Sequence, residues 1–410
     1  MKNDTCIDSY DIDDYTAGWG NRRGTIAMRG SILLFITATL TLFLSAPSAV
    51  TSAEVAFLPL GPSIEEVLEV SADGSTFVGT LSGSTEAFIG KIGEELTPLG
   101  TELSVRGTIG TAISGDGTVA AGIISDAYPD RSAFSWSSTS QMVRIDGGNG
   151  VTLDNVGGLS FHGDVIVGGM KIPSIPGRYA YRWTEATGAV SLGDLPGGNS
   201  DSEARDVSDD GLVVVGNSGV DRGYAPFRWT ASEGMVQLPG SGATAIAISP
   251  DGSAIVGSSR RHLAEGQRDE AAVWNVEGDL RLLGVLPAGR WSQATDASLG
   301  GKVIVGVSVA ADRYTDAFRW TEQAGMKSLA TLLSNGGVDL IGWRLHSVRA
   351  VSNDGTVFVG RATNPSGRRE EFVAKLPVDF VPEPSSFALV VGAVLYWGVV
   401  RRQLYCDSNL

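Results

Sequence analysis

Cysteine is nearly absent from this 410-residue chain, which has only Cys6 and Cys406. Both lie outside residues 54–380, so this stretch has neither a disulfide nor thiol chemistry. Histidine is also scarce, and His162, His262 and His346 are far apart in the sequence. A zinc or catalytic histidine site needs partners that converge in space, so this spacing favours exposed histidines and predicts no metal site.

Positive charge and long apolar runs are also in short supply. The chain has 31 Lys and Arg against 46 Asp and Glu, a net charge of −15, which argues against nucleic acid and anionic membranes as partners. The apolar runs at 32–44 and 387–400 hold 13 and 14 residues. A membrane-spanning helix needs roughly 20. Between these runs no segment shows helical periodicity over ten or more residues.

What the chain has instead is a repeat. Seven times between Ser71 and Gly360 a serine precedes a turn, a β-branched run and a glycine. Two copies, 160–168 and 298–306, lack an Asp-Gly pair in the turn. The other five have the pairs Asp73-Gly74, Asp116-Gly117, Asp210-Gly211, Asp251-Gly252 and Asp354-Gly355. Residues that recur in every unit are expected to hold the units together.

A second signature, Ala-Phe-Arg-Trp-Thr or a relative of it, follows each copy. Its tryptophans are spaced by 47, 46, 45 and 46 residues and are Trp136, Trp183, Trp229, Trp274 and Trp320. In the first and last units Gly90 and Ala374 stand at the corresponding position. The pattern predicts four short strands per unit, with the Asp-Gly pair turning the first strand into the second.

Seven such units predict an all-β repeat fold, a seven-bladed β-propeller, with a β-solenoid or an open array as the alternative. Residues 57–61 (Phe-Leu-Pro-Leu-Gly) resemble the end of a unit, such as residues 192–197 (Leu-Gly-Asp-Leu-Pro-Gly). We therefore expect residues 57–60 to supply the outer strand of the last blade, which would close the ring and leave no open edge.

The two ends differ in composition from the repeats and predict three parts, 1–53, 54–380 and 381–410. Met28-Arg29, an apolar run and small residues up to Ala53 have the layout of a secretory signal peptide. Met28 is the expected true start, and cleavage is expected after Ala53. At the other end, an apolar helix at 387–400 precedes a basic pair that would act as a cytoplasmic stop.

The C-terminal segment resembles the PEP-CTERM sorting signal. The resemblance rests on the tripeptide, the apolar helix and the basic end, in that order, and its residues are Val381, Pro382, Glu383, Pro384, Arg401 and Arg402. In that family an exosortase, a membrane protease, recognises the tripeptide and removes the tail of an exported bacterial protein. The resemblance implies an exosortase partner, transient membrane insertion through 387–400, and a cell-surface or matrix location near exopolysaccharide. Residues 403–410 are a departure, because the family usually ends sooner.

The repeat itself resembles the extracellular HAF repeat family. The resemblance rests on residues 317–320 (Ala-Phe-Arg-Trp) with Gly325-Met326, and on residues 192–198 with the Val-Val-Gly of residues 214–216. It implies export more than any reaction. The histidine that often precedes Ala-Phe in that family is absent here, so no histidine role is carried over.

Several recurring side chains could carry chemistry. The Asp-Gly turns suggest calcium, but no unit has the full acidic loop that ends in Glu, and a turn role already explains the aspartates. Arg182, Arg228 and Arg319 recur on the third strand of their units. We expect them to pair with acidic neighbours; the alternative is that they line a surface for acidic polysaccharide.

These observations predict an exported, non-catalytic binding or structural protein without a cofactor. Residues found in one unit only are the expected binding segments, since loops commonly carry binding; the longest are 173–178, 260–269 and 334–343. The alternative is a propeller-based polysaccharide hydrolase or lyase, which needs two carboxylates in one cleft. Its unit-specific candidates are Asp221, Glu265, Asp269 and Asp316.

Overall fold

The computed structural model describes residues 55–100, 106–125, 131–173, 175–198, 201–221, 223–264, 266–309 and 314–378. The expected signal peptide, both cysteines and the expected sorting residues, Val381–Pro384 with Arg401 and Arg402, lie outside the described residues. Within the described ranges, no helix has the length and apolar character needed to cross a membrane.

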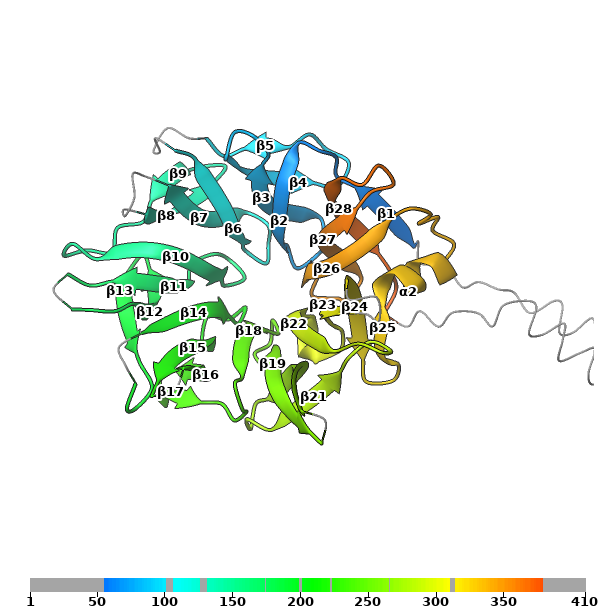
Figure 1. Ribbon diagram of the computed structural model, residues 1–410. Helices are drawn as coiled ribbons and strands as arrows, with labels where there is room; N and C mark the ends of the chain where they lie inside the picture. The colour runs from blue at the N-terminus through cyan, green and yellow to red at the C-terminus, as the bar shows by residue number, and fades with distance from the viewer. Residues whose placement is uncertain are drawn as a thin grey trace, which may run out of the picture. The chain divides into compact units, whose positions relative to one another are not determined.

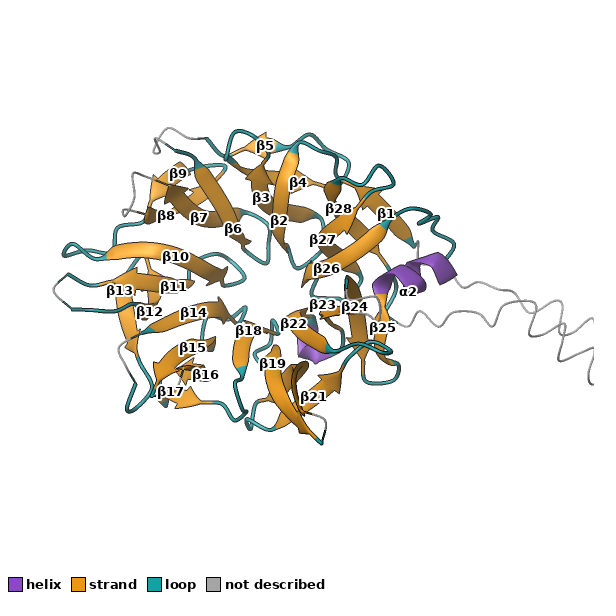
Figure 2. Ribbon diagram, in the orientation of Figure 1, coloured by secondary structure: helices purple, strands orange, loops and turns teal. Residues whose placement is uncertain are grey.

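Seven antiparallel sheets of four strands each form a ring, and each sheet is one blade (Figures 1 and 2). Along the chain, the strands of a blade run from the inner edge of the ring to the outer edge. Blade 1 consists of β2 (Ile64–Val70), β3 (Thr76–Leu81), β4 (Ala87–Lys91) and β5 (Thr97–Pro98). Blade 2 consists of β6 (Thr108–Ile113), β7 (Val119–Ser125), β8 (Arg131–Ser137) and β9 (Gln141–Arg144). Blade 3 consists of β10 (Thr152–Leu159), β11 (Ile166–Lys171), β12 (Tyr179–Thr184) and β13 (Gly188–Gly193).

Blades 4 to 6 follow the same order, and in blade 7 the outer strand is the N-terminal β1. Blade 4 consists of β14 (Ser202–Val207), β15 (Val214–Val220), β16 (Gly223–Thr230) and β17 (Gly234–Gln237). Blade 5 consists of β18 (Thr244–Ile248), β19 (Ala254–Leu263), β20 (Gly266–Asn275) and β21 (Leu280–Gly284). Blade 6 consists of β22 (Trp291–Ala297), β23 (Ile304–Val309), β24 (Thr315–Thr321) and β25 (Gly325–Ser328). Blade 7 consists of β26 (Arg344–Val351), β27 (Val357–Thr363), β28 (Arg369–Lys375) and β1 (Ala56–Pro59). The predicted seven-bladed propeller is thus confirmed.

The N-terminal strand closes the ring, as the sequence predicts. β1 pairs with β28 in antiparallel register, with Phe57 opposite Ala374 and Pro59 opposite Phe372. The Phe57 ring lies 5.1 Å from the Trp343 ring and 5.3 Å from the Phe372 ring, measured between centroids. Two segments from opposite ends of the repeat region therefore complete one sheet.

The recurring glycine of the second strand is required by a close approach between strands. In every blade, a Cβ on this glycine would lie 1.9–2.1 Å from a carbonyl oxygen of the inner strand, closer than any contact allows. The inner strand has a bulge at this point, as between Ala204 and Asp206 opposite Gly216. The seven glycines are Gly79, Gly122, Gly168, Gly216, Gly257, Gly306 and Gly360.

The recurring tryptophans fill the space between blades. Trp274 is fully buried and donates its indole N–H to the carbonyl oxygen of Pro239 at 2.8 Å. Trp320 is buried in the cluster between blades 5 and 6. The other three pack against neighbouring clusters with part of each ring exposed, and they are Trp136, Trp183 and Trp229.

Within the residues that the structure describes, one α-helix interrupts the β pattern, where the sequence predicts none. α2 (Leu329–Asn335) follows β25, and a single 3-10 turn, η1 (Leu299–Gly301), precedes β23. Leu329, Leu332 and Leu333 are buried against blades 6 and 7. At seven residues the helix is too short to give a periodic signal over ten.

Because successive strands are antiparallel, the connections alternate between two faces of the ring. Connections from first to second strand and from third to fourth lie on one face, which we call the turn face. Connections from second to third strand and from one blade to the next lie on the opposite face, which we call the loop face. The Asp-Gly pairs therefore all lie on the turn face.

Candidate functional site

The recurring aspartates are used within their own turns. In the blade 4 turn, Ser208 Oγ donates to Asp210 Oδ1 at 2.6 Å, and the same oxygen accepts the N–H of Leu212 at 3.0 Å. Ser208 Oγ in turn accepts the N–H of Val213 at 3.0 Å. The serine-to-aspartate bond recurs in the other four turns, at Asp73, Asp116, Asp251 and Asp354. Asp210 and its counterparts thus shape the hairpin turn, and Gly211 supplies the positive φ of 70°.

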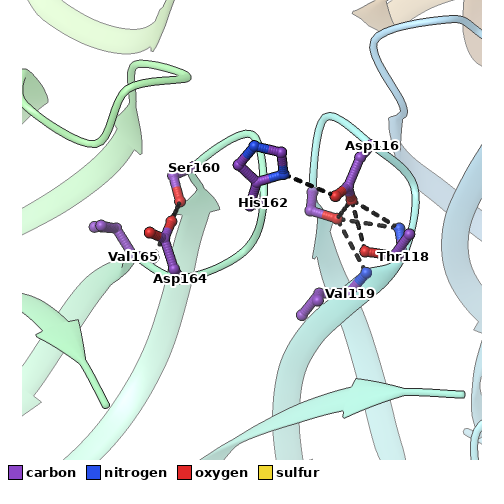
Figure 3. Close-up of polar contacts among 8 residues, drawn as sticks. Asp116, Thr118, Val119, Ser160, His162, Asp164 and Val165 are labelled. Atoms are coloured by element: carbon purple, nitrogen blue, oxygen red, sulfur yellow. Dashed lines mark hydrogen bonds and ion pairs between the residues drawn. The ribbon is translucent and has the colours of Figure 1, made fainter. Parts of the chain in front are cut away.

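The two turns without an Asp-Gly pair use the aspartate of the preceding blade. In blade 3, His162 Nδ1 lies 3.1 Å from Asp116 Oδ2, and Ser160 Oγ bonds to Asp164 (Figure 3). In blade 6 the N–H of Gly300 donates to Asp251 Oδ1 at 3.3 Å. Partial burial acts to raise the pKa of Asp116, but its hydrogen bonds, including the one to His162, outweigh this and lower the pKa to about 2.

The three histidines lie in different blades. The His162 side chain is 73% exposed, and His262 is exposed on β19. The expectation of exposure is wrong for His346, which lies in β26 and is only partly exposed, with its Nε2 2.7 Å from Thr363 Oγ1. Burial lowers the pKa of His346. In the part of the chain that the structure describes, no group of three His, Cys, Asp or Glu side chains is placed to hold a metal ion.

Backbone hydrogen bonds link neighbouring turns around the turn-face mouth of the channel. The N–H of Phe161 donates to the Asp209 carbonyl at 2.9 Å, and Asp209 N–H donates to the Pro250 carbonyl at 2.8 Å. Pro250 has no N–H, so it cannot donate the corresponding backbone hydrogen bond to blade 6. Asn353 Nδ2 donates to Asp209 Oδ2 at 3.0 Å and so joins blade 7 to blade 4.

Three carboxyl groups line the channel at one repeat position. Two residues before the repeat serine, three units have an acid, and these acids are Glu69, Asp206 and Asp296. The other four units have a small residue there, and these are Ala112, Gly158, Ala247 and Ala350. The acids border a cavity of about 350 Å³ and a smaller one of about 50 Å³ that is lined by turn-face residues such as Asp209 and Asn353.

Each of these carboxyl groups ties its blade to the next one. Asp206 accepts the N–H of Val207 at 2.7 Å and that of Ile248, in blade 5, at 2.8 Å. Asp296 likewise accepts the N–H of Ala297 and that of Val351, in blade 7, both at 2.7 Å. Glu69 accepts the N–H of Ile113 in blade 2.

The glycine at this position in blade 3, Gly158, leaves room for the carboxyl group of Asp206. A Cβ on Gly158 would lie 2.5 Å from Asp206 Oδ1, so a larger side chain at this position in blade 3 would displace the acid. At Gly158 the small residue is therefore a packing requirement of the neighbouring acid.

Burial raises the pKa of all three channel carboxyls, and repulsion between them adds to this for Glu69 and Asp206. The pKa of Asp206 rises to about 8 and that of Asp296 to about 7. Arg205 and Arg349 line the same cavity, but they pair with Glu203 at 3.4 Å and Glu66 at 3.2 Å. Carboxyls with such pKa values can exchange protons near neutral pH, as a general acid or base does.

Sequence reasoning missed these carboxyls, although aligning the units on the repeat serine would have revealed the acidic column. The candidates it chose lie in three different blades: Asp221 follows β15, Asp269 lies in β20 and Asp316 in β24. Asp269 pairs with Arg260 at 3.0 Å and Asp316 with Arg344 at 3.1 Å. Glu265 lies outside the described residues.

The arginines of the third strands do not share one kind of partner. Arg228 pairs with Glu233 at 2.6 Å, as expected. The expectation of an acidic partner does not match the bond of Arg182. Arg182 Nε donates to the Gly211 carbonyl in blade 4 at 3.1 Å, and Arg319 donates to the Val378 carbonyl.

The three unit-specific segments all lie on the loop face. Residues 173–178 connect β11 to β12, and residues 334–343 connect blade 6 to blade 7. Residues 260–269 are mostly strand rather than loop, because β19 and β20 continue as a hairpin of ten residues per strand. On this hairpin the buried Glu270 carboxylate accepts Arg268 Nε at 2.6 Å and Arg261 Nη1 at 3.3 Å.

No protein-family model and no curated protein matches the chain. Among solved structures, TolB from Acinetobacter baumannii is 13% identical with a TM-score of 0.42, over 75% of this chain and 65% of TolB. The β-propeller domain of the Trilobed protease from Pyrococcus furiosus is 10% identical with a TM-score of 0.48, over 78% of this chain and 98% of that domain. The chain thus spans about two thirds of the length of the Acinetobacter TolB. The class of the protein, a seven-bladed β-propeller, follows from its seven sheets and their closure by β1.

Proposed function

We propose that this protein is an exported, non-catalytic binding protein of the cell surface or extracellular matrix, and that it holds acidic polysaccharide on its loop face. Its C-terminal segment would be a PEP-CTERM sorting signal processed by an exosortase-type protease. Export is supported by the signal-peptide layout before Ala53 and by the order of tripeptide, apolar helix and basic pair.

The observation that carries the binding proposal is the long hairpin of blade 5. Its strands are longer than the other described strands. The hairpin carries Arg260, Arg261 and Arg268, and 30–48% of each of these side chains is exposed. Glu270, which pairs with two of them, is itself fully buried. These arginine side chains are therefore partly open to solvent while part of their counter-charge is not, on a chain that is otherwise strongly acidic. Arginine suits carboxylate or sulfate groups because it can donate two parallel hydrogen bonds.

The test is binding of residues 54–380 to an array of acidic and neutral polysaccharides, with variants of the hairpin. The double variant Arg260→Gln and Arg261→Gln leaves Arg268 to pair with the buried Glu270. We expect it to bind acidic polysaccharide about tenfold more weakly, as loss of one charge-assisted hydrogen bond of about 1.5 kcal/mol implies. The matched control is Arg281→Gln on β21 of the same blade, which removes one exposed cation elsewhere. The control removes one charge where the double variant removes two, so weakening of about threefold by the control would mean that only net charge matters. No binding by the unmodified protein would reject the proposal.

The second candidate is a polysaccharide hydrolase or lyase that uses the channel. The observation in its favour is the set of three carboxyls with raised pKa values, Glu69, Asp206 and Asp296. Against it, both oxygens of each aspartate already accept backbone N–H groups. The same array decides, because new reducing or unsaturated ends would indicate catalysis. If Asp206→Asn no longer produced these new ends, the catalytic site would be in the channel.

A further inference from the structure

A cavity of about 480 Å³ lies on the outer side of blade 6. β24, β25 and α2 line it, together with the connection from blade 5. Its apolar lining comes from Leu286, Pro287, Met326 and Leu332. This volume is within the range of sites that bury a small ligand or a short peptide segment.

The cavity exists because blade 6 is followed by a helix. β25 ends at Ser328, whose hydroxyl accepts the N–H of Thr331 and starts α2. Leu329 and Leu333 face the core, while Thr331 and Asn335 line the cavity. Among the described residues α2 is the one α-helix, so this cavity has no counterpart with a helical wall in the other blades.

The described part of the chain ends beside this cavity. Arg319, which lines it, donates to the carbonyl of Val378 and lies 3.5 Å from that of Pro377. The Val378 side chain packs against the apolar cluster that includes Leu332, and Leu332 is also a cavity residue. Residue 379 therefore starts within reach of the cavity.

We propose that residues 379–384 of the same chain occupy this cavity as an extended segment. Their sequence, Asp-Phe-Val-Pro-Glu-Pro, has apolar residues for the apolar lining and acids that can pair with Lys327. At about 3.3–3.6 Å per residue, six extended residues span roughly 20 Å. The two prolines favour an extended backbone for the residues before them. Because residue 378 already lies at the cavity wall, the next residues of the same chain are better placed to fill the cavity than a free small molecule.

The docking has a consequence for processing, and this part rests on the function proposed above. Residues 382–384 are the Pro-Glu-Pro tripeptide that the sorting protease would recognise. While these residues are docked, a protease that needs an extended substrate cannot reach them. Release from blade 6 would then precede cleavage. The docking itself does not depend on this role, so failure of the sorting proposal would leave it intact.

Hydrogen exchange of the full chain tests the docking directly. We expect the amides of residues 379–381 to exchange at least tenfold more slowly in the unmodified chain than in Ala324→Trp, which fills the cavity from its exposed rim. Val190→Trp, at an exposed position on the outer strand of blade 3, is the matched control and should leave this exchange unchanged. Equal exchange in the unmodified chain and in Ala324→Trp would overturn the proposal.

Cross-linking distinguishes the occupants. Since residues 54–380 contain no cysteine, the pair Phe380→Cys and Thr331→Cys can be placed in a Cys6→Ser, Cys406→Ser background. The proposal predicts a disulfide within one chain that Ala324→Trp reduces at least fivefold. Cross-linking between chains would assign the cavity to a second copy, and a yield that Ala324→Trp does not change would mean that proximity alone forms the bond. Either result would overturn the proposal.

Discussion

The channel carboxyls give a prediction in which pH and substitution act together. Asp296→Asn keeps the shape of the side chain but removes its titration and one of its two hydrogen-bond acceptors. Because the pKa of Asp296 is raised to about 7 in the folded state, the folded protein holds a proton that the unfolded chain releases near pH 4. Stability from this group is therefore fully present below pH 4 and is lost as pH rises towards 7.

The size of the effect follows from the shift. Three pKa units at 1.36 kcal/mol each correspond to about 4 kcal/mol, and we take about 2 kcal/mol because part of the carboxyl faces the channel, where solvent screens it. The side-chain amide of the Asp296→Asn variant would turn a donor towards a backbone N–H, which costs about 1 kcal/mol or more at pH 5. We expect the variant to be less stable than the unmodified protein at pH 5 and about equally stable or more stable at pH 8.

Urea unfolding followed by tryptophan fluorescence at pH 5, 6, 7 and 8 measures both curves. The control is Asp354→Asn on the turn face. Partial burial acts to raise the pKa of Asp354, but hydrogen bonds from Ser352 and Thr356 outweigh it and lower the pKa. Its stabilising contribution is present above pH 4 and is lost as pH falls, so the control should show no crossing between pH 5 and pH 8. Parallel curves for Asp296→Asn and the unmodified protein would refute the reasoning.

Three further predictions concern the scaffold. Gly216→Ala would place a Cβ 2.1 Å from the Glu203 carbonyl, so we expect a loss of about 3 kcal/mol or more in urea unfolding; an unchanged midpoint would contradict this. His162→Ala should cost less than about 1 kcal/mol, since the bond is exposed, while NMR should show a higher pKa for Asp116; an unmoved pKa would reject the contact. Phe57→Ala should cost about 3 kcal/mol and speed hydrogen exchange in β28 but not in β8; equal effects on both strands would argue against a role confined to blade 7.

Much of the fold could be predicted from the sequence because the same pattern of strand and turn residues occurs in all seven units. The Asp-Gly turns and the spacing of tryptophans such as Trp136 and Trp274 indicate four-stranded units. The resemblance of residues 57–61 to the end of a unit indicates the closing strand. Each of these signals is local, so no knowledge of how the blades meet is needed to read it.

The contacts between blades could not be predicted in the same way. The link from Asp206 to Ile248 spans 42 residues, and it depends on how two neighbouring blades pack side by side. His346 was expected to be exposed because one histidine in an alternating strand does not reveal which face is covered. Likewise, the hairpin at 260–269 was expected to be a loop, since its charged residues give no alternation of apolar and polar side chains.

The closure by β1 also determines how the ring responds to force and when the ring can close during synthesis and export. Residues 56 and 375 lie opposite each other, so the segments before and after the propeller leave from the same blade. Tension between those segments would act on the four residue pairs of β1 and β28 before it reached any other blade. The same four pairs cannot form until residue 375 has been synthesised and delivered, so a chain exported from its N-terminus would carry β1 unpaired for nearly the whole of its passage.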